Sequence, residues 1–207
     1  MAPKKKGKKA DEPPPSGLLP TVGLLHHSLH CADTSEAGSA VRHLRGGNRD
    51  ACVGVMAFTE GVHHIVYTID ASSNGSGFGI ILGVCDADAN QPFPAGKLTD
   101  RAGGPAWGMI ANSGQACKTV DCYQRGLVGA SLLPDEAAGG LKRHAKGAVV
   151  EVVVDMERRT LAYSINGGEL VVDTAASLPL CGVRPWMLLG WEGDTVTLEV
   201  DPPPPEE

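Results

Sequence analysis

Aromatic residues are scarce in this chain, because phenylalanine, tryptophan and tyrosine make up only 4% of its 207 residues. A packed core must therefore rely on valine, leucine, isoleucine and alanine. Long apolar runs are also missing. No stretch reaches the roughly 18 apolar residues of a membrane-spanning helix, and acidic residues and prolines follow the lysine-rich start where a secretory signal would be apolar. We expect an intracellular protein without membrane contacts.

Signatures of metal binding and catalysis are equally scarce. The six cysteines contain no Cys-x-x-Cys pair, and the hydrolase motif Gly-x-Ser-x-Gly is absent. In a reducing compartment these cysteines are free thiols, several of them small core residues. Cys117 and Cys122 have the spacing of half a zinc site only. The run His26-His27-Ser28-Leu29-His30-Cys31 has groups that ligate soft metals, but we favour an edge strand or short helix leading into the domain. We expect no catalytic residue, no metal, no cofactor and no enzyme activity.

Two further motifs have both a chemical and a structural interpretation. Gly75–Gly79 has the glycine content of a phosphate loop, yet it leads into a β-run without the lysine or the helix that would hold a phosphate. We therefore favour a hairpin turn. Asp86, Asp88 and Asn90 resemble calcium ligands, but the glycine and the final glutamate of an EF-hand loop are missing, and an acidic solvated loop explains them as well.

The region 148–201 predicts β-strands separated by tight turns. A β-branched run begins at Val149 and predicts a strand buried on both faces. Asn166-Gly167-Gly168 supplies the positive φ of a tight hairpin turn. Trp186 to Leu189 and Thr195 to Val200 are expected to form a last pair, joined by Trp191-Glu192-Gly193-Asp194. The pattern indicates antiparallel architecture, with expected strands at 149–154, 161–165, 170–172, 186–189 and 195–200.

This order of elements resembles the C-terminal half of the SPRY domain, called B30.2 when extended. The resemblance rests on Thr160-Leu161-Ala162-Tyr163-Ser164-Ile165-Asn166-Gly167 and on the later strand Arg184-Pro185-Trp186-Met187-Leu188-Leu189. Upstream, Ala106-Trp107-Gly108-Met109 is similar to the central Trp-Gly element of the family, and Gly79 to Val84 to its Gly-Val strand. In the segment Gly61 to Ile69, Ile65 stands where the family usually has tryptophan.

The resemblance covers residues 40–201 and implies an all-β fold. That fold is a concanavalin A-like sandwich of two antiparallel sheets, without a catalytic centre, that grips peptides or protein surfaces with loops at one rim. Around it we expect a basic and then proline-rich leader at 1–16, a lead-in segment at 17–39 and a Pro/Glu tail at 202–207. The termini are expected to be disordered or ordered by a partner.

The best candidate for a partner-binding anchor is Trp191. The family has a Trp-Gly turn at its peptide-binding rim, and Trp191-Glu192-Gly193 resembles that turn with one inserted residue. Burial of Trp191 against Trp186 or the opposite sheet is an equally open alternative, whereas Trp107 is assigned to the core. Further rim candidates lie in polar, turn-rich loops, because arginine and aromatic side chains often dominate interface energy; these are Arg42, Arg45, Phe93, Arg101, Tyr123 and Arg125.

Charge is unevenly distributed along the chain. Without the five leader lysines Lys4, Lys5, Lys6, Lys8 and Lys9, 13 of the 18 basic residues remain against 24 acidic ones, a balance of −11. Such an acidic body argues against broad nucleic-acid binding. The leader is interpreted as a solvated segment, as a tail that contacts acidic surfaces such as tubulin, or as a nuclear import signal. It also resembles the starts of ciliary axoneme proteins.

Two functions remain open on these grounds. The first is a structural subunit of a large cytoskeletal assembly, most plausibly the axoneme of a cilium or flagellum, that docks on other protein subunits through its loops and tails. Pro202 to Pro205 would stiffen the tail into polyproline II. The alternative is a peptide-recognition adaptor of a ubiquitin ligase or a chromatin complex, with a cytoplasmic or nuclear location. Adaptors usually carry a second domain that is not evident in this sequence, so we favour the first.

Overall fold

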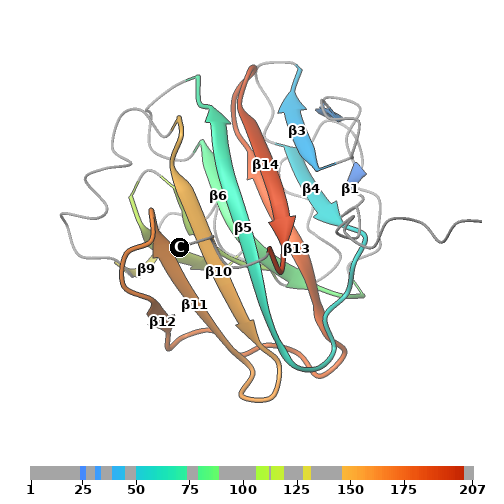
Figure 1. The fold of residues 1–207 in the computed structure, drawn as a ribbon, viewed down its shortest axis with the longest axis vertical. Coiled ribbons are helices and arrows are strands. Elements are labelled where there is room, and N and C mark those ends of the chain that lie inside the picture. Colours follow the sequence, from blue (N-terminus) through green and yellow to red (C-terminus); the bar gives the residue numbers. More distant parts are fainter. Residues whose placement is uncertain are drawn as a thin grey trace, which may run out of the picture.

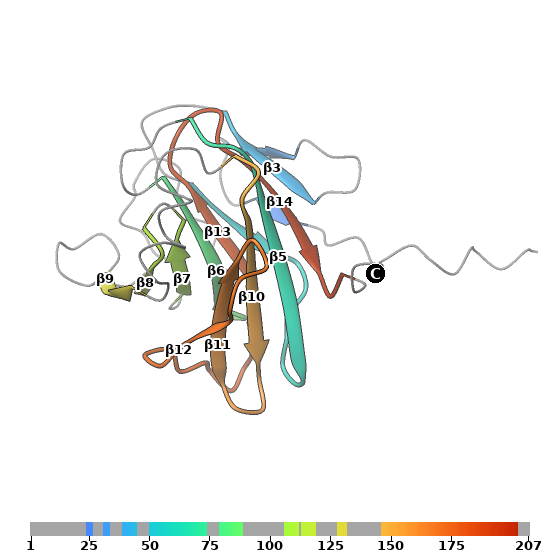
Figure 2. The same ribbon diagram turned by 60° about the vertical axis from the view of Figure 1, so that its left-hand side comes forward.

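The computed structural model describes residues 24–26, 31–33, 39–44, 50–73, 79–88, 106–111, 113–118, 128–131 and 146–202. The regular secondary structure in these ranges is entirely β, and it forms two antiparallel sheets of seven strands each, as the sequence predicted (Figure 1). The turned view in Figure 2 separates the two layers. Within the described ranges there is no helix of the length and apolarity needed to cross a membrane.

The two sheets are each built from segments that are distant in the chain. Sheet A has, in spatial order, β1 (Leu24–His26), β4 (Asp50–Gly54), β13 (Val183–Leu189), β6 (Ile80–Asp86), β7 (Ala106–Ile110), β8 (Gln115–Lys118) and β9 (Val128–Ser131). Sheet B has β12 (Val171–Asp173), β11 (Thr160–Ile165), β10 (Val149–Asp155), β5 (Val62–Ala71), β14 (Thr195–Val200), β3 (Ala40–His43) and β2 (Cys31–Asp33). The edge strands β1 and β2 fall in the lead-in segment and contain the two ends of the His26–Cys31 run.

The main core lies between the facing sides of the two sheets. Side chains alternate in and out along each strand, because successive residues of a β-strand point to opposite faces. Ile65 occupies a fully buried position on β5, where the family resemblance led us to expect tryptophan, and Trp107 is also buried here. The prediction that the strand at Val149 is buried on both faces was wrong, because Val149 and Val153 on its outer face are only partly covered.

Two connections that the sequence suggested were hairpins run between the sheets instead. The strand pair joined by Trp191 to Asp194 is split, since β13 lies in sheet A and β14 in sheet B. The Gly75–Gly79 segment likewise follows β5 of sheet B and precedes β6 of sheet A, so it does not close a hairpin. Turn residues predict a change of chain direction. They do not predict which strand pairs with which, because strand pairing depends on the packing of the whole sandwich.

The predicted hairpin at Asn166-Gly167 is confirmed. Asn166 and Gly167 have φ values of 51° and 72°, and the Asn166 side chain accepts a hydrogen bond of 2.9 Å from the backbone N–H of Val149. The return strand begins at Val171, one residue later than expected. Local chemistry is sufficient here, because asparagine and glycine tolerate the left-handed backbone that this turn requires.

A tyrosine hydroxyl links the two sheets across the core. Tyr67 of β5 donates a hydrogen bond of 2.6 Å to the carbonyl of Gly83 in β6, and it accepts one of 3.2 Å from the backbone N–H of Trp186 in β13. Burial raises the pKa of Tyr67 far above its ordinary value, so the hydroxyl remains a neutral donor. The link fixes the spacing of sheets A and B at the centre of the sandwich.

The outer side of sheet A carries a second apolar cluster, centred on Trp186. Trp186 pairs with Gly83, and Gly83 pairs with Gly108 on the next strand. An added Cβ on Gly108 would lie only 3.3 Å from the Trp186 ring. The missing side chain of Gly108 thus leaves room for the indole, and Trp186 is 1% exposed.

Candidate functional site

The turn that carries Trp191 lies at one end of the sandwich, between the last strands of the two sheets. It begins after Leu189 of β13 and ends at Thr195 of β14. The backbone N–H of Asp194 donates to the carbonyl of Trp191 at 3.0 Å, and Gly193 has a φ of 89° that favours glycine. The turn is also tied to β3 by two backbone hydrogen bonds of 2.9 Å with His43.

A buried carboxylate holds this turn in place. Asp194 is fully buried, and its two oxygens accept four hydrogen bonds. One oxygen accepts from the backbone N–H groups of Gly190 and Trp191, at 3.2 and 2.9 Å. The other accepts from the backbone N–H and the hydroxyl of Ser73, at 2.9 and 3.1 Å. Asp194 therefore joins the Trp191 turn to the end of β5.

The rim around this turn presents a mixed surface. Trp191 is half-buried, and its indole N–H is buried without a hydrogen-bond acceptor among the residues that the structure describes. Glu192 and Arg42 are exposed, and Leu44, directly after β3, is 46% exposed. We call Arg42, Leu44, Ser73, Trp191 and Glu192 the Trp191 rim. A half-buried indole beside exposed polar and apolar side chains is suited to contact a partner that has both kinds of group.

The structure brings together only part of the predicted rim. Trp191, Glu192 and Arg42 lie on described elements, although Arg42 lies within β3 rather than in a segment before the first strand. The neighbouring His43, which the sequence places in the same basic segment, is fully buried. The remaining predicted contacts lie outside the described residues; they are Arg45, Phe93, Arg101, Tyr123, Arg125 and the leader lysines Lys4, Lys5, Lys6, Lys8 and Lys9.

Sequence reasoning missed the residues that position the rim. Asp194 ends a Trp-Glu-Gly-Asp turn, and aspartate in a turn often accepts hydrogen bonds from nearby backbone, so this signal was available. Ser73 and Leu44 carry no comparable signal. Ser73 meets Asp194 across 121 residues of sequence, and only the folded sandwich brings them together.

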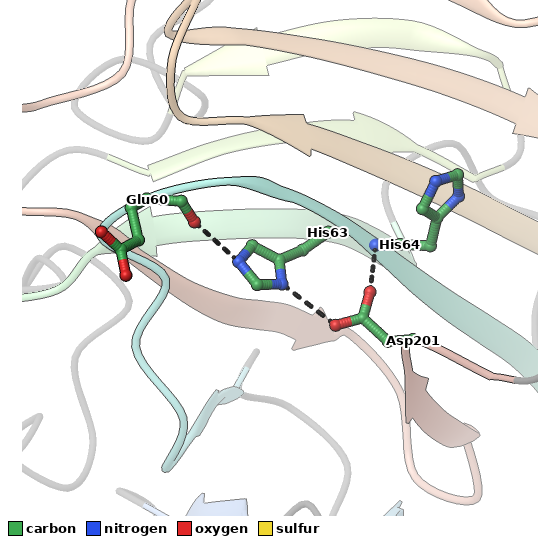
Figure 3. A network of polar contacts seen from close by, with 4 residues as sticks. All are labelled: Glu60, His63, His64 and Asp201. Carbon is green, nitrogen blue, oxygen red and sulfur yellow. Dashed lines mark hydrogen bonds and ion pairs between the residues drawn. The ribbon is translucent and has the colours of Figure 1, made fainter.

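A second polar network lies at the other end of β5 (Figure 3). One ring nitrogen of His63 contacts the Asp201 carboxylate at 3.0 Å, and the other contacts the carbonyl of Glu60 at 2.9 Å. The backbone N–H of His64 donates to the second oxygen of Asp201 at 2.8 Å. Because both ring nitrogens of His63 already face acceptors, neither is placed to take a proton from a substrate.

The neighbouring His64 also lacks a catalytic arrangement. Its ring contacts one oxygen of Glu151 at 2.7 Å, and the Ser164 hydroxyl donates to the other oxygen at 3.1 Å. The carboxylate thus lies between serine and histidine, whereas a nucleophilic serine requires the histidine in that position. The first network joins β5 to Asp201, directly after β14, and the second joins β5 to β10 and β11.

The Asp201 contact makes the attachment of the tail sensitive to acid. Desolvation raises the pKa of Asp201, but the hydrogen bonds from His63 and the His64 backbone and the charges of both histidines lower it more, so the net pKa falls below its ordinary value of 3.8. The unfolded chain therefore binds a proton more readily than the folded one. The stabilising contribution is complete above pH 3.8 and is lost as the pH falls through the lower folded pKa.

We predict that this contribution disappears in an Asp201→Asn variant. The difference in free energy of unfolding between wild type and variant should be constant near neutral pH and shrink below about pH 4. Urea unfolding measured between about pH 2 and pH 6 would detect the change. A difference that stays the same down to the acid limit would contradict the assignment of the contact to a charged carboxylate.

The acidic segment that resembled a calcium loop is explained by local hydrogen bonds. Asp86 accepts from the backbone N–H of Asp88 at 2.9 Å and from the thiol of Cys181 at 3.2 Å, while Asn90 lies outside the described residues. The side chains of Asp86, Asp88 and Cys181 lie close enough together to approach one metal ion. Desolvation, the hydrogen bond to Asp86 and the charges of Asp86 and Asp88 raise the pKa of the Cys181 thiol, which disfavours the thiolate that a metal requires. The side chain of Cys117 and all of Cys122, which have the spacing of half a zinc site only, lie outside the described residues.

Comparison with solved structures identifies the fold. No family model matches the sequence, and no curated protein matches it. Among solved structures, the SPRY domain of human HERC1 superimposes with a TM-score of 0.57 at 20% identity, covering 81% of this chain and 91% of that one. The TRIM65 PSpry domain superimposes with a TM-score of 0.55 at 18% identity, covering 91% and 99%. The resemblance inferred from Thr160–Gly167 and the later strand is thus confirmed at the level of structure, and the chain has the fold of a SPRY domain.

Proposed function

We propose that this protein is a non-catalytic protein-interaction module that binds its partner through the Trp191 rim. The observation that carries the proposal is the fixed turn that presents Trp191, in which the buried Asp194 carboxylate accepts four hydrogen bonds from Gly190, Trp191 and Ser73. A side chain that is ordered before binding loses little entropy when the complex forms.

We further propose that the partner belongs to a large cytoskeletal assembly, with the ciliary or flagellar axoneme as the leading candidate. The support is the lysine leader, whose five positive charges suit an acidic protein lattice such as tubulin. In this arrangement the rim makes the specific contact and the leader adds salt-dependent attraction. The same rim would serve a peptide adaptor of a ubiquitin ligase or chromatin complex equally well, so the experiment must distinguish the two.

The test compares tagged wild type with a Trp191→Ala variant in ciliated cells. Proteins that co-purify with each are quantified by mass spectrometry, and the tag is imaged. Truncating a central tryptophan in an interface costs about 2 kcal/mol or more, which is about thirtyfold in Kd. We expect Trp191→Ala to lose the partners that wild type retains. The matched control is Leu180→Ala, because Leu180 is 83% exposed and lies beyond the opposite end of β13.

The identity of the lost partners decides between the two functions. Axonemal proteins recovered in fixed ratio, together with a ciliary signal, would support the structural subunit. Ligase or chromatin components with a diffuse or nuclear signal would support the adaptor. If Trp191→Ala and Leu180→Ala bind the same partners as wild type, the rim is not the binding site.

A further inference from the structure

The outer faces of the two sheets differ in how much they are covered. On the outer side of sheet A the apolar side chains are buried, including Trp186 at 1% and Leu188 at 5% exposure. On the outer side of sheet B, Val66 and Val153 are only partly covered, and Val172 is 50% exposed. None of the described strands or turns packs over this side of sheet B. Among the residues that the structure describes, sheet B therefore has an open face.

The centre of this open face is acidic. Glu199 on β14 and Glu151 on β10 lie on either side of Val66 on β5, in one row across the sheet. Asp70 lies further along β5, where it accepts a hydrogen bond of 2.7 Å from Thr197. Glu199 is exposed and makes no hydrogen bond or ion pair with any described residue. We call Val66, Asp70, Glu151, Val153 and Glu199 the open face.

No described arginine or lysine lies at the centre of the open face. Glu151 contacts the His64 ring and the Ser164 hydroxyl. The arginine and lysine side chains of the described elements next to the face lie at its margins, with Arg42 on β3 and Lys146 in the turn before β10. A cationic segment laid across β14 and β10 would therefore meet carboxylates in the middle and apolar surface between them.

We propose that the chain's own lysine leader, residues 4–9, docks on the open face in the free protein. The leader has five lysines in six residues, and their charge is opposite to that of the face. Lysine stems can lie along Val66 and Val153 while their ammonium groups reach Glu151 and Glu199. This contact is separate from the Trp191 rim and does not depend on the function proposed for that rim.

The leader can reach the face without rearrangement of the sandwich. The chain enters the described structure at β1, which contacts β2 at the edge of sheet B (Figure 1). Neighbouring strands are about 4.8 Å apart and facing sheets about 10 Å apart. A path from β1 over the edge of sheet B is therefore about 20 Å long to the strand of Glu199 and about 30 Å long to the strand of Glu151. The intervening residues 10–23 include four prolines and span at most about 50 Å when extended, which exceeds both distances.

Docking within one chain has a consequence for any partner of the leader. Residues joined by a short flexible segment meet at an effective concentration in the millimolar range, so the open face holds the lysines against weak competitors. An acidic partner surface must displace this contact to recruit the leader. The contact also weakens with salt, because exposed charges are screened within about 3 Å at 1 M ionic strength.

The test uses carbodiimide cross-linking of the full chain, which joins a lysine amine to a nearby carboxylate as an amide. Links are mapped by mass spectrometry at about 50 mM and about 1 M salt. We expect links from the leader to concentrate on Glu199 and Glu151 and to fall at least about fivefold at high salt. In Glu199→Lys, the leader link to Glu151 should fall to a similar extent. The matched control Glu157→Lys changes an exposed glutamate in the β10–β11 turn. In this control the leader link to Glu151 should remain.

Any of four results would overturn the proposal. The leader links could spread evenly over Glu151, Glu157, Glu169 and Glu199, or the Glu151 link could survive in Glu199→Lys. Mixing chains of two isotopic compositions would reveal links between molecules, which would assign the face to a second copy. As a check that does not rely on the Glu199 variant, removal of residues 1–9 should shift the amide resonances of β5, β10 and β14 at low salt only. Unchanged resonances would also overturn the proposal.

Discussion

Replacing Gly83 with alanine is expected to abolish cooperative folding. Gly83 lies in the middle of β6, and an added Cβ would fall 2.0 Å from the carbonyl oxygen of Trp107 and 2.6 Å from the Cα of Gly108. Both contacts are with backbone of the neighbouring strand β7, so no side-chain rotation can relieve them. The strands would have to separate where the Tyr67 hydroxyl and the Trp186 ring also depend on them.

The expected cost of Gly83→Ala exceeds about 4 kcal/mol, which is a large part of the total stability of a domain of this kind. Thermal unfolding followed by circular dichroism would show a broad or absent transition. The matched control is Gly168→Ala in the β11–β12 connection, where the nearest atom to an added Cβ is the Ile165 carbonyl at 3.1 Å. We expect the control to change stability by about 1 kcal/mol or less. A Gly83→Ala protein that unfolds like wild type would show that β6 and β7 are spaced differently.

Replacing Asp194 with alanine is expected to destabilise the fold and to disorder the Trp191 rim. The change removes the acceptor of four hydrogen bonds and leaves the backbone N–H groups of Gly190, Trp191 and Ser73 without it. Each buried group left unsatisfied costs about 1 to 3 kcal/mol, although water admitted by the smaller side chain offsets part of this. We expect a net loss of about 3 kcal/mol, measured as the change in urea unfolding midpoint at constant slope.

Two further variants distinguish the residues that position the Trp191 turn from the residue that contacts the partner. Ser73→Ala removes only one of the four hydrogen bonds, so it should cost about 1 kcal/mol. Trp191→Ala should leave the free energy of unfolding within about 1 kcal/mol of wild type, because the side chain is only half-buried. The same variant should nevertheless weaken partner binding. If Asp194→Ala has no larger effect on stability than Ser73→Ala, the carboxylate does not act as the anchor of the turn.

Local pattern was enough to predict several strands and one turn of this fold. Alternation along Thr160–Ile165 and Thr195–Val200 matches the observed strands, since one face of each strand must be apolar to meet the core. The hairpin at Asn166-Gly167 required only the conformational preferences of two residues. These strands and this turn depend on residues that are neighbours in sequence. The assignment of Trp107 to the core, which rested on the family resemblance, was also correct.

The sequence by itself thus determined the antiparallel β architecture and the position of Trp191 in a turn, and its resemblance to the SPRY family implied the sandwich. The tertiary structure decided that β13 and β14 belong to different sheets, which places Trp191 at the rim rather than in a hairpin. It also brought Ser73 to Asp194 over 121 residues and Tyr67 to Trp186 over 119. Such contacts carry no local signature, because the free energy that selects them comes from burying both sheets against each other, and that term depends on the whole chain at once.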